Sequence, residues 1–582
     1  SNIYINSNNK LEKIDYKINI SGKFNYKFNK IFKTKKFVIK DSELLLKLHG
    51  QFKYGYFENN ILSVKTLNTS NFEVYENTIK NLNFNVILSG DIKNKINFEI
   101  TDYSSKSKNN YLYEFKNISG SYDNKNKIFS LYANNIDINT DKLFEDYNFL
   151  KISDFKFSGS AEKLKIKFSI NKSLSNFFLE GNFYNSYVQY QKNYINNFAG
   201  FVNFKNNTIS VDVNSKNIEI YNNSILNKKL KFDFVTGKLL VVDISNPNIS
   251  LNKILLSNNH IKFTVSGNIN KALDSINIHS YLKYVDMKHI TNYLPKNFMS
   301  KKTSDYFSNA FRKGETKNGY ISISGSLSDY PFYDDLSGIS YAIFPISNLS
   351  VNYKKDWIPF ENINGKAYFI KRRAYFDSDD FKVLNTKVEN SNLYIEDVKN
   401  VVLDISGDLN GPLNDLIIYS NKAKLSNIKK NNINKLSGKA NTMFKISLAF
   451  NGNKNFYKSL IHLKNINYNY DKDNKFKNIN GIINFKNNKF FTEENNYLEG
   501  FYNDTKIKFQ LKTNNDENFV VSGIQEVQLN KYIKIKNINN IISGRSNWEY
   551  KIYFPGFNSK KDNIKVFAVS NLYGTSVKFP FP

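Results

Sequence analysis

Apolar and polar residues alternate along most of this chain. Clear examples are residues 164–170, 209–213 and 506–511, where every second position is apolar. A period of two is typical of β-strands with one apolar and one polar face. Between such runs lie short clusters of Asn, Asp and Lys, for example 203–207, which favour turns because Asn and Asp tolerate left-handed backbone conformations. The pattern predicts an all-β chain of about 45–50 strands joined by short turns.

A tripeptide of an apolar residue, a small or polar residue and glycine recurs from Ile20-Ser21-Gly22 to Ile542-Ser543-Gly544. Glycine inside a strand marks a bulge, a bend or a close backbone approach, whereas glycine at a strand end marks a turn. Both interpretations are compatible with the sequence. Uniformly short connections argue against a two-layer sandwich, whose connections cross between sheets. The predicted fold is a long twisted antiparallel β-meander, curled into an open groove around its apolar face.

One stretch, near residues 295–313, breaks the alternation and predicts a short helical insertion. Phe307, Ala310 and Phe311 fall on one helical face, and Gly314 follows as a C-terminal stop. We expect this helix to cover an edge or an open end of the sheet, or to gate the groove.

The chain has 582 residues, enough for several domains, but only 9 prolines and no Gly/Ser-rich linker. We therefore expect one continuous array in three parts: a repetitive β-groove over 1–292, a distinctive central region over 293–370, and a continuing β-groove over 371–582. The chain begins in the middle of the pattern and has no apolar run of transmembrane length, which suggests a fragment of a longer chain.

The formal net charge of +30 raises the question of nucleic-acid binding. Arginine, the residue that phosphate and guanine recognition prefers, is scarce, and the lysines are scattered among the strands. A solvated basic surface, attracted to anionic lipid, is the favoured interpretation, and nucleic acid is not an expected partner.

Candidate catalytic chemistry is sparse. There is no cysteine, and the five histidines show no metal-binding spacing. The carboxylate pairs Asp334-Asp335 and Asp379-Asp380 lie in polar, turn-like stretches. We expect a protein that is not an enzyme and that holds neither a cofactor nor a metal.

Apolar positions on the clearest strands are the candidates for lining the groove. They are Ile96, Phe98, Ile166, Phe168, Ile170, Ile321, Ile323, Phe369, Ile507 and Phe509.

The region from about Tyr293 to Phe369 resembles the central region of the YhdP family of AsmA-like proteins. The resemblance rests on residues spread over this stretch, namely Leu294, Pro295, Phe311, Gly314, Gly325, Pro331, Phe332, Trp357 and Gly365. Two positions depart from the family pattern: Ile358 separates Trp357 from Pro359, and Tyr330 replaces the usual Phe before Pro331.

The resemblance implies a periplasmic bridge of the Gram-negative envelope, anchored to the inner membrane by a helix outside this chain. It implies non-enzymatic phospholipid transport between the inner and outer membranes, with other envelope proteins as further partners. Acyl chains would lie on the apolar groove, and head groups would stay at its polar lip.

Three alternatives remain open. A TamB-like scaffold would assist outer-membrane protein assembly by strand addition. A surface fibre would have a dry interior filled by side chains. A nucleic-acid-binding protein would show salt-dependent retention of DNA without bound lipid.

Overall fold

The computed structural model describes residues 2–7, 13–27, 37–67, 71–74, 77–91, 93–107, 112–139, 155–169, 177–243, 246–294, 301–330, 332, 336–352, 357–398, 400–422, 433–449, 455–469, 475–487, 489–514, 519–531, 541–554 and 565–578. Among them, 34 strands form one antiparallel sheet, and β33 and β36 pair separately. The chain divides into two compact units: unit 1 holds 1–281 and 323–330, and unit 2 holds 282–322 and 331–582.

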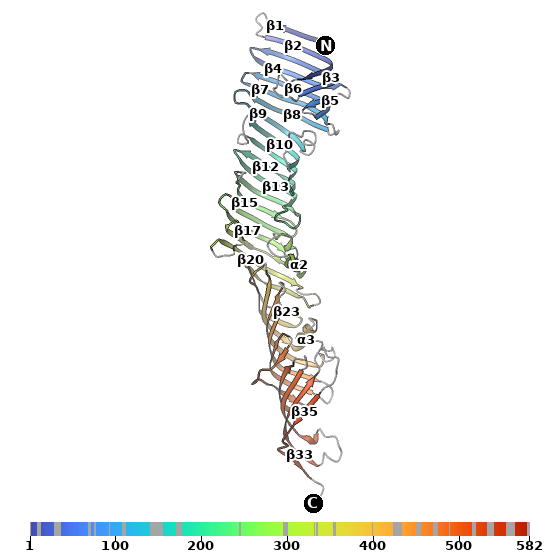
Figure 1. Cartoon of the computed structure of the whole chain (residues 1–582), viewed down its shortest axis with the longest axis vertical. Coiled ribbons are helices and arrows are strands. Elements are labelled where there is room, and N and C mark those ends of the chain that lie inside the picture. The colour runs from blue at the N-terminus through green and yellow to red at the C-terminus, as the bar shows by residue number, and fades with distance from the viewer. Residues whose placement is uncertain are drawn as a thin grey trace. The chain divides into compact units, whose positions relative to one another are not determined.

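Unit 1 is built from strands that follow one another in chain order (Figure 1). Its strands are β1 (Asn2–Ser7), β2 (Lys13–Lys27), β3 (Phe37–Lys53), β4 (Tyr56–Leu67), β5 (Asn71–Val74), β6 (Asn77–Asp91), β7 (Lys95–Ser107), β8 (Leu112–Asp123), β9 (Ile128–Asn139), β10 (Phe155–Ser169), β11 (Phe178–Tyr190), β12 (Asn193–Lys205), β13 (Thr208–Tyr221), β14 (Leu230–Val242), β15 (Asn248–Ser257) and β16 (Ile261–Asn270). Strands β17 (Ser275–Asp286) and β19 (Gly319–Ser326) each have residues in both units.

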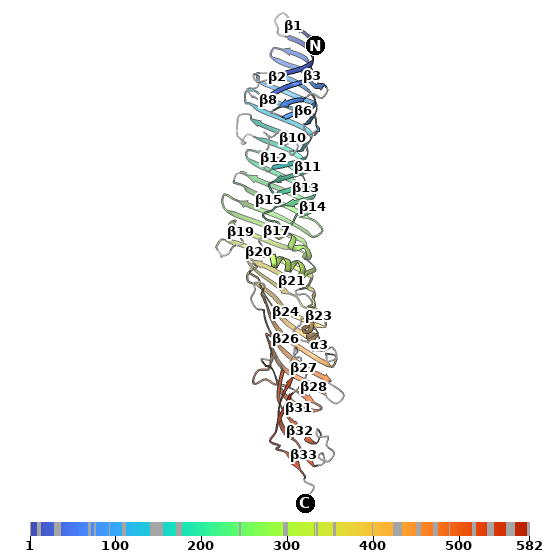
Figure 2. The same ribbon diagram turned by 45° about the vertical axis from the view of Figure 1, so that its right-hand side comes forward.

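Unit 2 continues the meander and adds short helices (Figure 2). Its elements are η3 (Met287–Asn292), α2 (Lys301–Ala310), β18 (Phe311–Thr316), β20 (Gly338–Val351), β21 (Phe360–Ile370), β22 (Arg373–Ser378), β23 (Phe381–Val383), β24 (Thr386–Ile395), β25 (Val402–Pro412), α3 (Leu413–Lys422), β26 (Leu436–Ala449), β27 (Phe456–Asn469), β28 (Lys475–Lys486), β29 (Lys489–Phe491), β30 (Leu498–Tyr502), β31 (Thr505–Thr513), β32 (Phe519–Val527), η4 (Leu529–Lys531), β33 (Ile542–Gly544), β34 (Ser546–Phe554), β35 (Lys565–Val569) and β36 (Thr575–Val577).

The predicted antiparallel meander is confirmed. Most sequential strands pair, for example β10 with β11, β11 with β12 and β26 with β27. Some positions in the sheet are filled by two short strands: β4 and β5 both pair with β3 and with β6. The sequence predicted about 45–50 strands, at one strand and turn per 12 residues. Fewer strands are described, because many are longer than expected; β3, for example, has 17 residues.

Long strands carry an internal β-bulge, which the alternation alone did not reveal. At the bulge one residue inside the strand has positive φ, and in most of these strands the residue after it is buried. We call this line of positions the bulge seam; its residues include Asn117, Lys163, Asn185, Asn217, Asn348, Asn362, Asn465 and Asn478. Strand pairing shifts register at these points, for example between Leu463 and Ile466. Because a bulge adds one residue to a strand, it bends the strand and increases its local twist.

Apolar-x-Gly tripeptides lie on strands next to the bulged strands, opposite the bulges. The backbone N–H of Asn465 in β27 donates a hydrogen bond to Asn480 Oδ1 in β28 at 2.9 Å, and Asn480 is the middle residue of Ile479-Asn480-Gly481. The N–H groups of Lys253 and Asn348 are bound in the same way by Ser266 Oγ and Asn364 Oδ1. The middle residue of these tripeptides therefore satisfies a backbone donor that the bulge removes from the ladder.

The glycine of the tripeptide makes room for a neighbouring backbone. A Cβ on Gly438 would lie 2.6 Å from the carbonyl oxygen of Asn465 and 2.8 Å from the Cα of Ile466. Strand-interior glycines therefore mark close backbone approach, one of the two interpretations that the sequence left open.

Replacing Asn465 by valine is expected to destabilise β26–β28 by about 1–2 kcal/mol, because a β-branched residue is strained at the φ of 51° found there. Asn465→Gly, the matched control, relieves this strain and should stay within about 1 kcal/mol of the parent. Native-state hydrogen exchange of the β27 amides measures both effects. Equal protection in the two variants would contradict the left-handed assignment.

The helical insertion is confirmed in part and corrected at its C-terminal end. Helix α2 ends at Ala310, so Phe311 and Gly314 belong to strand β18 rather than to the helix. Gly314 has φ of 134° and faces Leu349, the residue that follows Asn348 in the bulge seam. Gly314 is therefore a strand glycine of the kind described above and not a helix stop.

Candidate functional site

The alternating pattern places an apolar face on one side of the unit 1 sheet. In β7, Ile96, Phe98 and Ile100 are half-buried, whereas the intervening Asn97 and Glu99 are exposed. Around the bulge seam the pattern becomes buried, exposed, exposed, buried, as in Ala161 to Leu164 of β10. Ile166 and Phe168 therefore lie on the same face as Ala161. Odd-numbered residues face this side before the bulge and even-numbered residues after it, because the bulge adds one residue to the strand.

The apolar face of unit 1 buries side chains fully at the bulge seam. Ala133, Ala161 and Leu164 are 0%, 1% and 2% exposed and form one cluster with Ile118 and Phe183. The described part of this unit is a single layer of strands (Figures 1 and 2). One layer can bury side chains this fully only if the strands bend around them, which the bulges allow.

Aromatic side chains extend the apolar face away from the seam. Phe98, Phe129 and Phe168 form a row across β7, β9 and β10, with ring centroids 5.4 and 5.2 Å apart. The row crosses β8 at Gly120, where a Cβ would lie 2.3 Å from the Phe98 ring. Phe168 remains 38% exposed, so this row presents apolar surface that the described part of the protein does not fill.

The opposite face of the sheet is polar and carries ion pairs. Lys165 pairs with Glu180 at 3.0 Å, and Lys238 with Asp212 at 3.1 Å. The Tyr194 hydroxyl donates to Glu219 at 2.6 Å. This hydrogen bond, with smaller contributions from the charges of two nearby lysines, lowers the pKa of the Glu219 carboxyl. The charged residues therefore lie away from the apolar face.

The remaining groove candidates divide between half-buried and core positions. Ile321 and Ile323 are half-buried on β19. Phe369 packs against a core cluster of unit 2, 5.7 Å from Phe344. Ile507 is 3% exposed and belongs to a second core cluster, against which Phe509 packs. Ile170 lies outside the described residues.

The family-motif residues occupy structural positions. Phe332 is fully buried with φ of 65°, and Trp357 is buried next to Tyr306 and Phe360. Leu294 is half-buried after η3, Gly325 lies within β19, and a Cβ on Gly365 would lie 2.2 Å from the Asp377 carbonyl. Pro295 and Pro331 lie outside the described residues.

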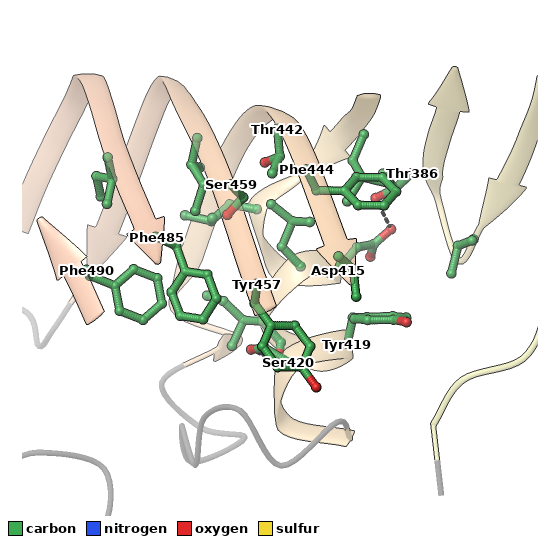
Figure 3. Close-up of a pocket in the computed structure, with 18 of the residues that line it drawn as sticks. Thr386, Asp415, Tyr419, Ser420, Thr442, Phe444, Tyr457, Ser459, Phe485 and Phe490 are labelled. Carbon is green, nitrogen blue, oxygen red and sulfur yellow. Dashed lines mark hydrogen bonds between the residues drawn. The ribbon is translucent and has the colours of Figure 1, made fainter. Parts of the chain in front are cut away.

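Unit 2 contains a pocket of about 370 Å³ on the apolar face, between helix α3 and strands that range from β21 to β32 (Figure 3). Aromatic side chains make up much of its wall, including Phe444, Tyr457, Phe485, Phe490 and Phe519. Phe485 and Phe490 are neighbours in the register of β28 and β29, with ring centroids 4.7 Å apart. Thr442, Ser459 and Asp415 are among the few polar residues of the wall.

Helix α3 is held against the sheet at both of its ends. Near its start, the buried Asp415 carboxylate accepts hydrogen bonds from the backbone N–H of Asn385 at 2.7 Å and the Thr386 hydroxyl at 3.1 Å. Near its end, the Tyr419 ring lies 5.8 Å from Trp357 and 6.4 Å from Phe360. Burial raises the pKa of the Tyr419 hydroxyl strongly, which marks the dry surroundings of this end.

The sequence interpretation missed α3 and the pocket beneath it. Pro412 directly before the helix, Asp415 in its first turn, and Leu413 and Leu416 three residues apart are helix-start signals. They lie beside the apolar run 416–419, which also fits a short buried strand. Among the described residues, no helix has the length and apolar character required to cross a bilayer.

Comparison with known proteins identifies the family. None of the curated proteins compared with the chain matches it. The sequence profile of the YhdP family, described as YhdP protein, matches residues 117–582. This match covers most of the chain and extends far beyond the central region on which the resemblance rested. The chain therefore belongs to the YhdP family.

Proposed function

We propose that this protein carries phospholipids between the inner and outer membranes of the Gram-negative envelope, without catalysing a reaction. The observation that supports this most directly is the apolar surface that each unit presents: the face around the bulge seam in unit 1, and the apolar pocket in unit 2. Membership of the YhdP family supports the envelope setting. Residues of the Phe98, Phe129 and Phe168 row would contact the acyl chains directly.

The energetics favour sliding over tight binding. Burial of an acyl chain on the apolar face contributes about 0.8 kcal/mol for each methylene removed from water. Because neighbouring strands offer similar apolar surface, a lipid that leaves one contact gains an equivalent one. Head groups would stay in water at the strand ends, where lysines attract anionic phosphates. The same proposal places the protein in the periplasm with an anchor in the inner membrane, as the family resemblance implies.

Photocrosslinking tests the proposal at three consecutive positions of β10. Ile166 and Phe168 lie on the apolar face, whereas Lys167 is exposed on the other face, with its Nζ 5.8 Å from the Phe178 ring. With p-benzoylphenylalanine at each position in turn, we expect phospholipid adducts at 166 and 168 and none at 167. Mass spectrometry of the adducts identifies the lipid.

The other outcomes separate the competing functions. Lipid adducts at none of the three positions would overturn the transport proposal. Adducts to unfolded outer-membrane proteins in their place would favour a TamB-like scaffold. Equal labelling at all three positions would show surface adsorption rather than binding to the apolar face.

A further inference from the structure

Helix α3 covers the pocket of unit 2, whereas the aromatic row of unit 1 is partly exposed. Leu413 and Leu416 of α3 pack against the same core cluster as Ile461 and Ile483 of the sheet. The pocket beneath the helix has a volume of about 370 Å³, which falls within the roughly 300–1,000 Å³ typical of small-molecule sites. A lipid on the open sheet can slide, whereas a chain under α3 is enclosed by both the helix and the strands.

One buried hydroxyl group in the pocket wall makes no hydrogen bond within the described structure. Thr442 is 4% exposed, and its Oγ1 has no hydrogen-bond partner among the described residues. It lies between Leu409 and Ile461 in the strand register, so its surroundings are apolar. Buried hydroxyls are normally hydrogen-bonded, and an exception calls for a functional explanation. A ligand with an acceptor oxygen at this depth would satisfy it.

The hydrogen bonds already made in the pocket limit where a ligand oxygen can bond. Asp415 lines the same pocket, and its oxygens accept from Asn385 and Thr386 (Figure 3 shows the bond to Thr386). The oxygens of Asp415 are already engaged as acceptors, so a ligand oxygen at this depth needs another donor. Thr442, whose hydroxyl has no partner among the described residues, is suited to donate a hydrogen bond to an ester carbonyl.

We infer that the pocket under α3 is a holding site for a single acyl chain of a glycerolipid, whose ester carbonyl accepts a hydrogen bond from the Thr442 hydroxyl. The inference rests on the proposed lipid carriage and adds one site on the path at which a lipid is held. Phe444, Phe485 and Phe490 surround the chain, and α3 separates it from water. Lipid released from this site continues along the open apolar face.

The test uses the full chain with p-benzoylphenylalanine at Tyr457 in the pocket or, separately, at Ile166 in unit 1. Vesicles containing tritiated dioleoylphosphatidylethanolamine are the probe. Ser459 lies between Phe444 and Phe485 in register, so Ser459→Phe fills the pocket. Met443→Phe places the same side chain on the opposite, exposed face and is the matched control. We expect Ser459→Phe to lower labelling at 457 at least tenfold and to leave labelling at 166 unchanged, and Met443→Phe to change neither.

A second variant tests the hydrogen bond without changing side-chain volume. In the Thr442→Val variant, bound lipid is expected to leave the pocket about twofold to tenfold faster during a chase with unlabelled vesicles. The measured quantity is the labelling at position 457 on irradiation after each chase time. An unchanged rate would overturn the role of Thr442. Labelling at 166 without labelling at 457, or labelling at 457 that survives Ser459→Phe, would overturn the holding site alone. Labelling at neither position would instead overturn the proposed lipid carriage.

Discussion

Replacing Gly267 by alanine is expected to destabilise strands β16 and β17 by about 2–6 kcal/mol. Two effects add: the φ of 139° is strained for any residue with a Cβ, which costs about 1–3 kcal/mol. The new Cβ would also lie 2.0 Å from the carbonyl oxygen of Asn277 and 2.8 Å from the Cα of Ile278. Relief of such a clash costs about 1–3 kcal/mol more, because backbone atoms cannot rotate away.

Gly55→Ala separates these two effects. Gly55 has φ of 86° in the turn between β3 and β4, but no atom lies within 4 Å of the position of its Cβ. This variant should therefore show only the backbone strain. Native-state hydrogen exchange in each strand pair is the suitable measurement, since a long array does not unfold in one step. If Gly267→Ala costs no more than Gly55→Ala, the close approach of β16 and β17 is wrong.

Replacing Phe168 by aspartate is expected to lower phospholipid transfer between donor and acceptor vesicles at least tenfold. Phe168 ends the aromatic row on the apolar face and is 38% exposed, so its replacement affects the surface more than the core. An acyl chain that passes an ionised carboxylate must remove water from it, which costs several kcal/mol. In the proposed path lipids pass the strands in series, so one such barrier would limit the whole path.

Lys167→Asp is the matched control for this effect. It introduces the same carboxylate one residue away, but on the exposed polar face of β10. Transfer by this variant should stay within about twofold of the parent, since surface charges away from the path interact weakly through water. Equal loss of transfer in both variants would show that net charge, rather than the apolar face, controls the rate.

The fold was predictable because one signal dominates the sequence. Strict alternation, as in Lys95 to Ile100, requires no long-range information and marks both the strands and their two faces. The bulges were not predicted, since a left-handed residue inside a strand looks like a turn residue. Their signal exists all the same: Lys-Asn-Ile recurs at Asn117, Asn217, Asn465 and Asn478, each time inside a strand. Alternation resumes one position out of step after each of them.

The candidate site was predictable in kind and less so in detail. Ile96, Phe98 and Ile166 lie on the apolar face as alternation requires, but Ile507 is taken up by the core, which local pattern cannot distinguish. The pocket depends on α3, whose position is set by Asp415 reaching the hairpin of β23 and β24, 30 residues away from Asn385 in sequence. Such a contact follows from tertiary packing and leaves only a weak trace in the sequence.

The sequential pairing of the strands has a consequence for how the chain folds. Most described strands pair with strands one or two places before or after them in the chain, so most pairings join neighbouring segments. Local contacts of this kind keep the entropy of loop closure small and make early structure possible. The growing sheet can therefore add one strand at a time during synthesis, in the order of the chain, and its newest strand serves as the template for the next.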